Sequence, residues 1–251
     1  MGSAYFYLEF LLAYLTLLTS HYTNPSIFAL DYTLVPDSSY PTQLHQTIAG
    51  YRHALSLVAN DSSRICLAGD SAGATLQLSL LLHIAQSPEY EKLRPGFATL
   101  ISPWVSLVSP KNRNTRSDYL DASSLHLYGS QYAALQSNLS DPLVSPGACT
   151  DGKWWARAAP SKGIFVHFGA EEVFGPEIRE WVARLRRAGV AVGVKEEPGG
   201  IHAWVVARVF LEGGLEERVR GLRELVGAVR VAIPSNVESE VHDVGVPRKR
   251  E

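Results

Sequence analysis

The sequence predicts an α/β domain with a mostly parallel sheet and helices on its faces. Short apolar runs, each the length of a buried strand, alternate with longer stretches whose apolar residues recur with helical spacing. The chain has 251 residues, of which 46% are hydrophobic and 19% charged, which is enough apolar material for one substantial core. Because strands that alternate with helices usually pair in parallel, this pattern indicates helices packed on a parallel sheet.

The individual elements follow from residue spacing. Five apolar runs fit buried strands, at residues 26–30, 64–68, 97–101, 164–168 and 190–194. Amphipathic or apolar stretches fit helices at residues 44–58, 74–85, 178–185 and 215–229. We expect the folded domain to span residues 1–233 and residues 234–251 to form a disordered tail.

The N-terminal stretch, residues 4–18, is apolar except for Glu9 and Thr16. A membrane span needs about 20 apolar residues, and a signal peptide needs a positive leading region, which Met1-Gly2-Ser3 does not supply. We therefore expect a buried amphipathic helix, with a membrane or interfacial segment and a signal peptide as the alternatives. The cellular location is unknown from the sequence, and the cytoplasm is the default expectation because no signal peptide is evident.

Between Trp104 and Lys162 the regular alternation stops, and Ser, Pro, Asn, Asp and Gly become frequent. A long irregular insertion in a compact domain usually covers a functional site. We predict that residues 105–162 form a lid or a wall of a substrate pocket, with one or two short helices, one of them around residues 124–136.

Charge and cysteine content exclude several classes of function. The 23 basic and 25 acidic residues give a formal charge of −2 with no basic stripe, so nucleic acid is not an expected partner. Cys66 and Cys149 lack CxxC spacing and the histidines lack metal-ligand spacing, so we predict neither a disulfide framework nor a metal site. The sequence predicts no oligomeric state.

The strongest local motif is Gly69-Asp70-Ser71-Ala72-Gly73, between a predicted strand and a predicted helix. A nucleophile elbow needs a strand-to-helix turn so tight that larger side chains two residues before and after the serine would collide, which explains the glycines. The turn also aims the Ala72 N–H, at the start of a helix, toward the carbonyl that Ser71 would attack. The motif predicts Ser71 as a nucleophile and Ala72 as an oxyanion donor.

A serine hydroxyl needs a histidine base and an orienting carboxylate, which follow the serine in chain order in this architecture. His202 is the histidine that follows a late strand and precedes a helix, so we predict it as the base. The acid should follow the strand at residues 164–168, where Glu171 and Glu172 stand and no aspartate does. Spacing favours Glu172, and Glu171 remains the alternative.

These motifs together resemble the fold-3 α/β hydrolases, the hormone-sensitive-lipase-like esterases, and especially their fungal members. The resemblance rests on Leu30-Asp31-Tyr32-Thr33-Leu34-Val35-Pro36-Asp37, the pentapeptide around Ser71, Glu172-Val173-Phe174 and Pro198-Gly199-Gly200-Ile201-His202. It implies hydrolysis of a small-molecule or lipid carboxylic ester through a Ser71-His202-Glu172 triad and an acyl-enzyme, without a cofactor. The family more often has aspartate where this chain has Glu172.

One further family feature is expected to be missing. The family carries His-Gly-Gly-Gly, which supplies backbone N–H groups to the oxyanion hole, shortly before a Gly-Ser pair, and this chain begins Met1-Gly2-Ser3. We therefore expect an N-terminally truncated sheet, with a slot between the strands at residues 26–30 and 64–68. The alternatives to an active esterase are a non-catalytic binding protein of the hydrolase fold and an inactive fragment, and membrane association stays open.

Overall fold

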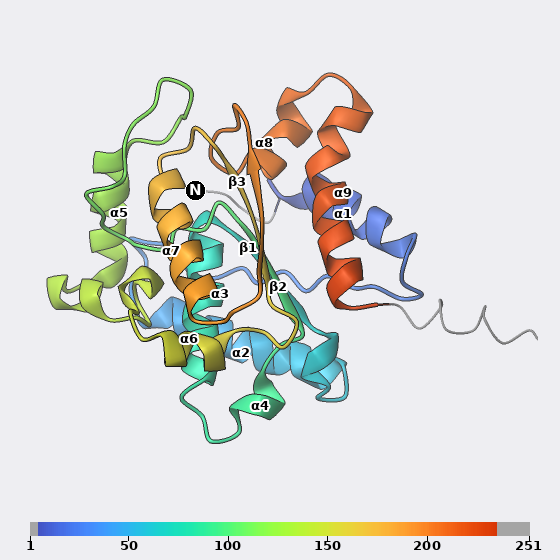
Figure 1. Cartoon of the computed structure of the whole chain (residues 1–251), viewed down its shortest axis with the longest axis horizontal. Helices are drawn as coiled ribbons and strands as arrows, with labels where there is room; N and C mark the ends of the chain where they lie inside the picture. The colour runs from blue at the N-terminus through green and yellow to red at the C-terminus, as the bar shows by residue number, and fades with distance from the viewer. Residues whose placement is uncertain (1–4, 235–251) are drawn as a thin grey trace, which may run out of the picture.

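The computed structural model describes residues 5–234 (Figure 1). Of the predicted tail, only Pro234 lies among the described residues. The helices are α1 (Leu8–Thr19), α2 (Thr42–Leu57), α3 (Ser71–Ile84), α4 (Tyr90–Leu93), α5 (Ala122–Ala133), α6 (Gly152–Ala158), α7 (Gly175–Arg187), α8 (Trp204–Leu211) and α9 (Leu215–Ala232). The strands are β1 (Cys66–Asp70), β2 (Phe97–Ile101), β3 (Ile164–Gly169) and β4 (Val192–Glu197), and short 3₁₀ helices occupy Ser62–Arg64, Gln136–Ser140 and Pro146–Ala148.

The four strands form one parallel sheet in the order β1-β2-β3-β4. The fold class predicted from the sequence is confirmed, as are four of its five strands. Strands β1 and β4 begin at Cys66 and Val192 rather than at residues 64 and 190. Because all four strands run in the same direction, the residues that follow them emerge at the same edge of the sheet.

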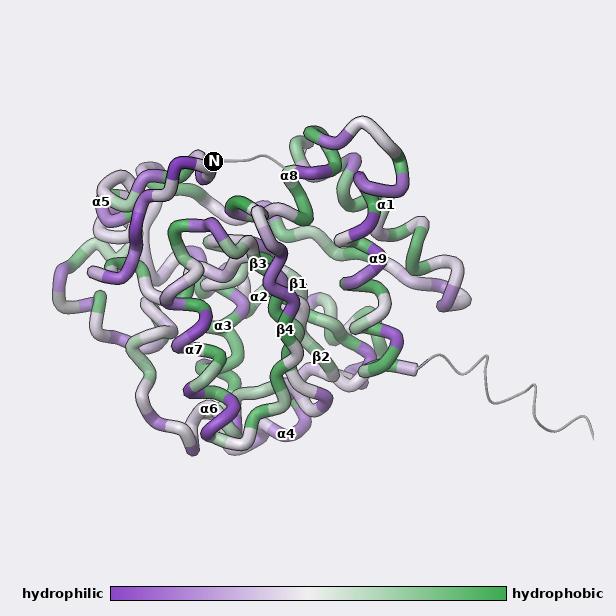
Figure 2. Tube along the Cα trace, turned by 45° about the horizontal axis from the view of Figure 1, so that its top comes forward, coloured by the Kyte–Doolittle hydropathy of each residue, from purple (hydrophilic) through white to green (hydrophobic). Residues whose placement is uncertain are grey.

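Helices cover both faces of the sheet (Figure 1). Successive side chains of a strand point to opposite faces, so each strand contributes to the packing on both sides. Within β2, Ala98 and Leu100 pack with helices α2, α3, α6 and α7, whereas Phe97 and Ile101 pack with α1, α8 and α9. Along α7, hydrophilic residues alternate with hydrophobic ones (Figure 2), and its residues Ile178, Val182 and Leu185 are buried. The result is a three-layer arrangement with a core on each side of the sheet.

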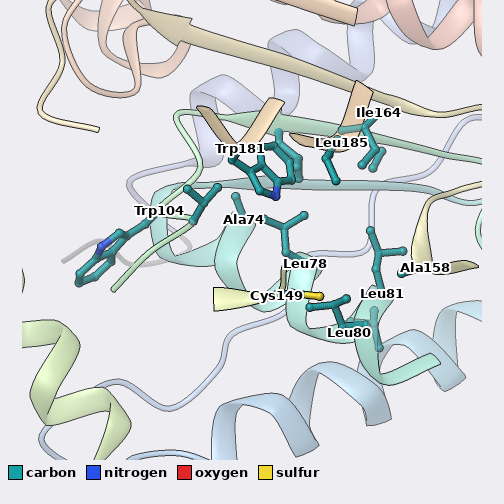
Figure 3. Close-up of a cluster of buried hydrophobic side chains, with 14 of the residues drawn as sticks. Ala74, Leu78, Leu80, Leu81, Trp104, Cys149, Ala158, Ile164, Trp181 and Leu185 are labelled. Atoms are coloured by element: carbon teal, nitrogen blue, oxygen red, sulfur yellow. The ribbon is translucent and has the colours of Figure 1, made fainter. Parts of the chain in front are cut away.

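The larger core lies between the sheet and helices α3 and α7 (Figure 3). Leu78 and Leu81 of α3 and Trp181 and Leu185 of α7 are at most 1% exposed. Burial of large apolar side chains is the main favourable contribution to folding. This core fixes α3, and with it the residues at its N-terminus, against the end of β1.

Helix α1 forms where a buried amphipathic helix is predicted, and one of its faces packs on the side of the sheet opposite the larger core. Phe10, Tyr14 and Leu18, spaced four residues apart, are buried against α8 and α9, whereas Leu8 and Leu12 are exposed. None of the helices within residues 5–234 is both long enough and apolar enough to cross a bilayer. The apolar character of this stretch is thus used partly for packing within the domain.

The strand predicted at residues 26–30 is wrong. This segment has no ladder hydrogen bonds, and in the described part of the chain no strand pairs with the outer edge of β1. A strand requires a neighbour to bond with, and residues 26–30 have none. The segment lies instead along α2, where a Cβ at Gly50 would be 3.3 Å from both Phe28 and Leu30.

The insertion predicted at residues 105–162 holds two α-helices, α5 and α6. Helix α5, at Ala122–Ala133, confirms the helix expected around residues 124–136. Helix α6 places Trp155, which is 2% exposed, against Trp181 of the larger core. The part of the insertion that carries Trp155 therefore packs into the core rather than bordering a site.

Candidate active site

The turn from β1 to α3 has the geometry of a nucleophile elbow. Ser71 is the first residue of α3 and has a positive φ of 50°, an unfavourable conformation for a non-glycine residue. A Cβ at Gly69 would lie 2.8 Å from the backbone of Gly73 and Ala74, so only glycine fits there. The expected steric reason for a glycine is confirmed at position 69.

The same steric expectation is wrong for Gly73. A Cβ at this position would have no heavy atom within 4 Å among the described residues, because it would point into open space. The tightness of the turn is therefore imposed on its strand side, where β1 passes close to the first turn of α3. Ala72, the predicted oxyanion donor, lies in the first turn of α3, where backbone N–H groups have no intrahelical partner.

Asp70, the residue before the predicted nucleophile, is held by a tyrosine from the N-terminal region. The Tyr7 hydroxyl donates a 2.7 Å hydrogen bond to Oδ2 of Asp70. Burial raises the pKa of Asp70, and the Tyr7 hydrogen bond and the positive charge of protonated His202 oppose that rise. The pairing of Tyr7 with Asp70 is not predicted from the sequence.

Glu172 lies just after β3 and is 2% exposed. Its Oε2 accepts hydrogen bonds from the Gly169 backbone N–H at 3.0 Å and from the Ser102 hydroxyl at 2.5 Å. Glu171, the alternative acid, is instead exposed, and its carboxylate accepts a hydrogen bond from Ser117. Of the two candidate glutamates, Glu172 is the one directed into the interior.

His202 lies after β4, is 3% exposed, and faces Glu172. Its Nδ1 is 3.8 Å from Oε1 of Glu172, and neither atom has a hydrogen-bond partner among the described residues. Catalytic hydrogen bonds are often long without substrate, and two facing buried polar atoms favour a closer contact. The Phe174 ring packs against the imidazole at 5.2 Å, edge to face, and limits its rotation.

The turn after β2 connects the elbow with the other two predicted residues. The Trp104 backbone N–H donates to the Ser71 carbonyl at 3.2 Å, while Ser102 contacts Glu172. The structure therefore brings Glu172 and His202 into contact, with Ser71 at the same sheet edge. Within residues 5–234 the Ser71 hydroxyl has no hydrogen bond to His202.

Two residues that were not predicted from the sequence organise this region, Ser102 and Asp118. Ser102 follows directly after a buried strand, and a polar residue in that position of a parallel sheet is a signal that could have identified it. Asp118 accepts hydrogen bonds from backbone N–H groups of Val173 and His202. It lies in the irregular insertion, where no local pattern distinguishes it from other aspartates.

One group of possible metal ligands occurs in the described residues, formed by His167, Glu197 and Glu224 with ligand atoms within 4.8 Å of one another. His167 Nε2 is 3.0 Å from Glu224, and Glu197 is 2.6 Å from Arg220 and 3.5 Å from Lys195. These groups already neutralise one another. The cluster is a partly buried ion-pair network in which Lys195 and Arg220 offset the charges of Glu197 and Glu224, and Nδ1 of His167 has no hydrogen-bond partner among the described residues.

Comparison with known sequences identifies the family of this chain. A family model described as the alpha/beta hydrolase fold matches residues 12–206. The protein mug81 of Schizosaccharomyces pombe, named as a candidate steryl acetyl hydrolase, is 30% identical over 171 residues, covering 64% of this chain and 44% of that protein. An acetyl-hydrolase of Streptomyces hygroscopicus is 30% identical over 185 residues, covering 71% of this chain and 57% of that protein. The chain thus spans about half the length of these relatives.

Comparison with solved structures agrees with the sequence comparison. A hormone-sensitive lipase from a metagenome library superposes with a TM-score of 0.69 at 23% identity, covering 88% of this chain and 72% of that one. The resemblance drawn from the motifs is confirmed. The chain belongs to the α/β hydrolase fold family, among relatives of the hormone-sensitive-lipase type.

Proposed function

We propose that this chain hydrolyses carboxylic esters through a Ser71-His202-Glu172 triad. The observation that carries the proposal is the contact between two buried groups, His202 Nδ1 and Glu172 Oε1, at 3.8 Å, on the sheet edge where Ser71 has its positive φ. Buried titratable groups brought together from separate loops, beside a strained serine, are typical of a catalytic site. The names of the two relatives, both acetyl hydrolases, agree with this class of reaction.

In the proposed reaction, the Ser71 hydroxyl attacks the ester carbonyl carbon while His202 accepts its proton. Glu172 stabilises the resulting imidazolium. The N–H of Ala72 and the N-terminus of α3 stabilise the negative charge on the carbonyl oxygen. When the tetrahedral intermediate collapses, the C–O bond to the alcohol breaks and His202 returns the proton to that oxygen. Water, deprotonated by His202, then cleaves the acyl-Ser71 ester by the same steps.

We propose that residues 105–162 form one wall of this site. Tyr119, in the stretch that precedes α5, has its ring 6.1 Å from the His202 ring and its hydroxyl 3.4 Å from the His202 carbonyl oxygen. The aromatic rings of Trp104 and Phe174 stack at 5.6 Å beside the histidine. An apolar wall next to the base suits the acyl or alcohol part of a small-molecule or lipid ester.

Hydrolysis of p-nitrophenyl acetate by the wild type and three variants tests the proposal. Ser71→Ala should abolish turnover, and His202→Ala should lower it at least ~10³-fold, because nucleophile and base act as one unit. Ser56→Ala, which changes an exposed serine on α2, serves as the control and should retain wild-type turnover. Turnover that survives Ser71→Ala would refute the proposal. Saturable binding of the ester without turnover in the wild type would favour the non-catalytic binding protein instead.

A further inference from the structure

We propose that Asp118 is a positioning residue of this site, which fixes the loop of the base against the loop of the acid. The inference rests on the proposed function, because it concerns how Glu172 and His202 are held together. Asp118 belongs to the irregular segment between β2 and α5, far in sequence from both residues. It enters the site from the insertion, and its carboxylate accepts hydrogen bonds from backbone N–H groups of the two loops, so its proposed role is to place other groups.

The two oxygens of one carboxylate join the two loops. Oδ2 of Asp118 accepts the Val173 backbone N–H at 2.8 Å, one residue after Glu172. Oδ1 accepts the backbone N–H of His202 at 3.2 Å. Hydrogen bonds to an ionised acceptor are about twice as strong as neutral ones. Asp118 therefore holds the main chain at the acid and at the base with a single rigid group.

The Ser102 hydroxyl also bridges the two loops, between Glu172 and the Ala203 N–H, whereas the backbone contacts between the loops lie further from the reacting side chains. The Ala170 N–H donates to the Glu197 carbonyl at 2.9 Å, and the Glu171 N–H donates to the Gly200 carbonyl at 3.0 Å. These bonds join the loops where they leave β3 and β4, before either reactive side chain. Asp118 extends the connection to the main chain at positions 173 and 202, next to the acid and at the base itself.

Asp118 is itself held in place by the acid loop. Its backbone N–H donates to the Thr115 hydroxyl at 3.1 Å, and that hydroxyl donates to the Glu171 carbonyl at 2.7 Å. The next residue, Tyr119, places its hydroxyl 3.4 Å from the carbonyl oxygen of His202. The segment that carries Asp118 is thus anchored on both sides of the carboxylate, so the carboxylate is preorganised to accept its two hydrogen bonds.

The separation of Glu172 and His202 makes this placement consequential. At 3.8 Å the two atoms are beyond hydrogen-bond length, so a small shift of either loop decides whether they meet. Displacement of a catalytic group by about 1 Å is enough to cost ~100-fold in rate. We expect loss of Asp118 to reduce turnover without a comparable loss of substrate binding, because both oxygens of its carboxylate are occupied by backbone N–H groups of the two loops.

Kinetics of Asp118→Ala and Asp118→Asn, with Asp121→Asn as the matched control, test the inference. Asp121 lies in the same segment and caps α5 by accepting the Ser124 N–H at 2.8 Å, a function that Asn can also perform. Asp118→Ala should lower kcat ~10- to 100-fold with KM changed less than ~3-fold. Asp118→Asn keeps one acceptor oxygen and should lower kcat less than Asp118→Ala does. If Asp118→Ala does not fold, the kcat of Asp118→Asn alone tests the inference.

A second readout is the downfield proton resonance that a histidine Nδ1–H shows when it is hydrogen-bonded to a carboxylate, assigned by its loss in His202→Ala. Asp118→Ala should weaken or shift this resonance at acidic pH, and Asp121→Asn should leave it unchanged. A wild type that lacks both the resonance and ester turnover would contradict the proposed function itself. A wild type with both, matched by unchanged kcat and an unchanged resonance in both Asp118 variants, would overturn the inference alone.

Discussion

The hydroxyl of Ser102 donates a 2.5 Å hydrogen bond to Oε2 of Glu172 from a position with no solvent exposure. The same hydroxyl oxygen accepts the backbone N–H of Ala203 at 2.9 Å. One side chain after β2 therefore links the proposed acid to the residue that follows the proposed base. Because hydroxyl, carboxylate and amide are all buried, none of them can exchange its partner for water without cost.

Ser102→Ala is expected to lower the free energy of unfolding by about 1 to 3 kcal/mol, because it leaves the Ala203 N–H without its acceptor in a buried position. Ser102 has a positive φ of 45°, a conformation that alanine adopts no less readily than serine, so the change in stability reports the loss of the hydroxyl. Equilibrium denaturation in urea measures the change. Ser56→Ala should stay within about 0.5 kcal/mol of the wild type. Equal stability of the two variants would argue against the Ser102 contacts.

Glu172→Gln is expected to lower kcat for ester hydrolysis ~10³- to 10⁴-fold, because a neutral amide does not stabilise the imidazolium formed on His202. Glu171→Gln changes the adjacent exposed glutamate in the same way and should leave kcat unchanged. Steady-state kinetics of the two variants side by side distinguish the candidate acids. A larger effect at position 171 than at position 172 would show that Glu171, and not Glu172, orients the base.

The fold class, four strands and the main helices could be predicted because each is encoded by local periodicity. The elbow could be predicted as well, since its glycine and serine stand between a strand and a helix. The prediction of a strand at residues 26–30 was wrong because an apolar run shows only that a strand is possible, whereas a strand forms only beside a neighbour with which it can pair. Periodicity carries no information about which other strand that neighbour is.

The supporting residues of the site could not be predicted, for a related reason. Asp118 acts through contacts with residues 173 and 202, and Tyr7 through a contact with Asp70 at a separation of 63 residues. Such pairings arise only when the sheet has assembled. The sequence also left open which of Glu171 and Glu172 is the acid. The two differ in the direction of their side chains, because Glu171 is exposed to solvent and Glu172 is buried.

The raised pKa of Asp70 predicts a pH-dependent cost to stability. Burial makes the folded protein bind this proton more tightly than the unfolded chain, whose carboxyl keeps its ordinary pKa of 3.8. The stability contribution of Asp70 is therefore complete below that pKa and is lost as pH rises through the higher pKa of the folded state. Asp70→Asn, which cannot ionise, should gain stability relative to the wild type as pH rises above the ordinary carboxyl pKa of 3.8.

Chemical denaturation of both proteins across that range measures the difference. In the Asp70→Asn variant the Tyr7 hydroxyl can still donate to the side-chain amide oxygen only if the loop is undisturbed, so circular dichroism should first establish an unchanged fold. A variant that loses stability relative to the wild type as pH rises would contradict the assignment. It would mean that the ionised carboxylate is favoured in the folded state.

The packing of α1 predicts a contrast between two of its apolar residues. Phe10→Ala removes a side chain that is 6% exposed and should cost about 3 to 5 kcal/mol of unfolding free energy. Leu12→Ala removes one that is 55% exposed and should change the unfolding free energy by less than about 0.5 kcal/mol. Thermal or urea unfolding measures both. Similar small effects would show that α1 does not dock on α8 and α9.

The central claim, that Ser71 is a nucleophile activated by His202, is tested most directly by a fluorophosphonate probe followed by intact mass and peptide mapping. The wild type and Ser56→Ala should each gain one adduct, located on Ser71. Ser71→Ala should gain none, and His202→Ala should react far more slowly. An adduct that persists at wild-type rate in Ser71→Ala, or that maps to another serine, would contradict the claim.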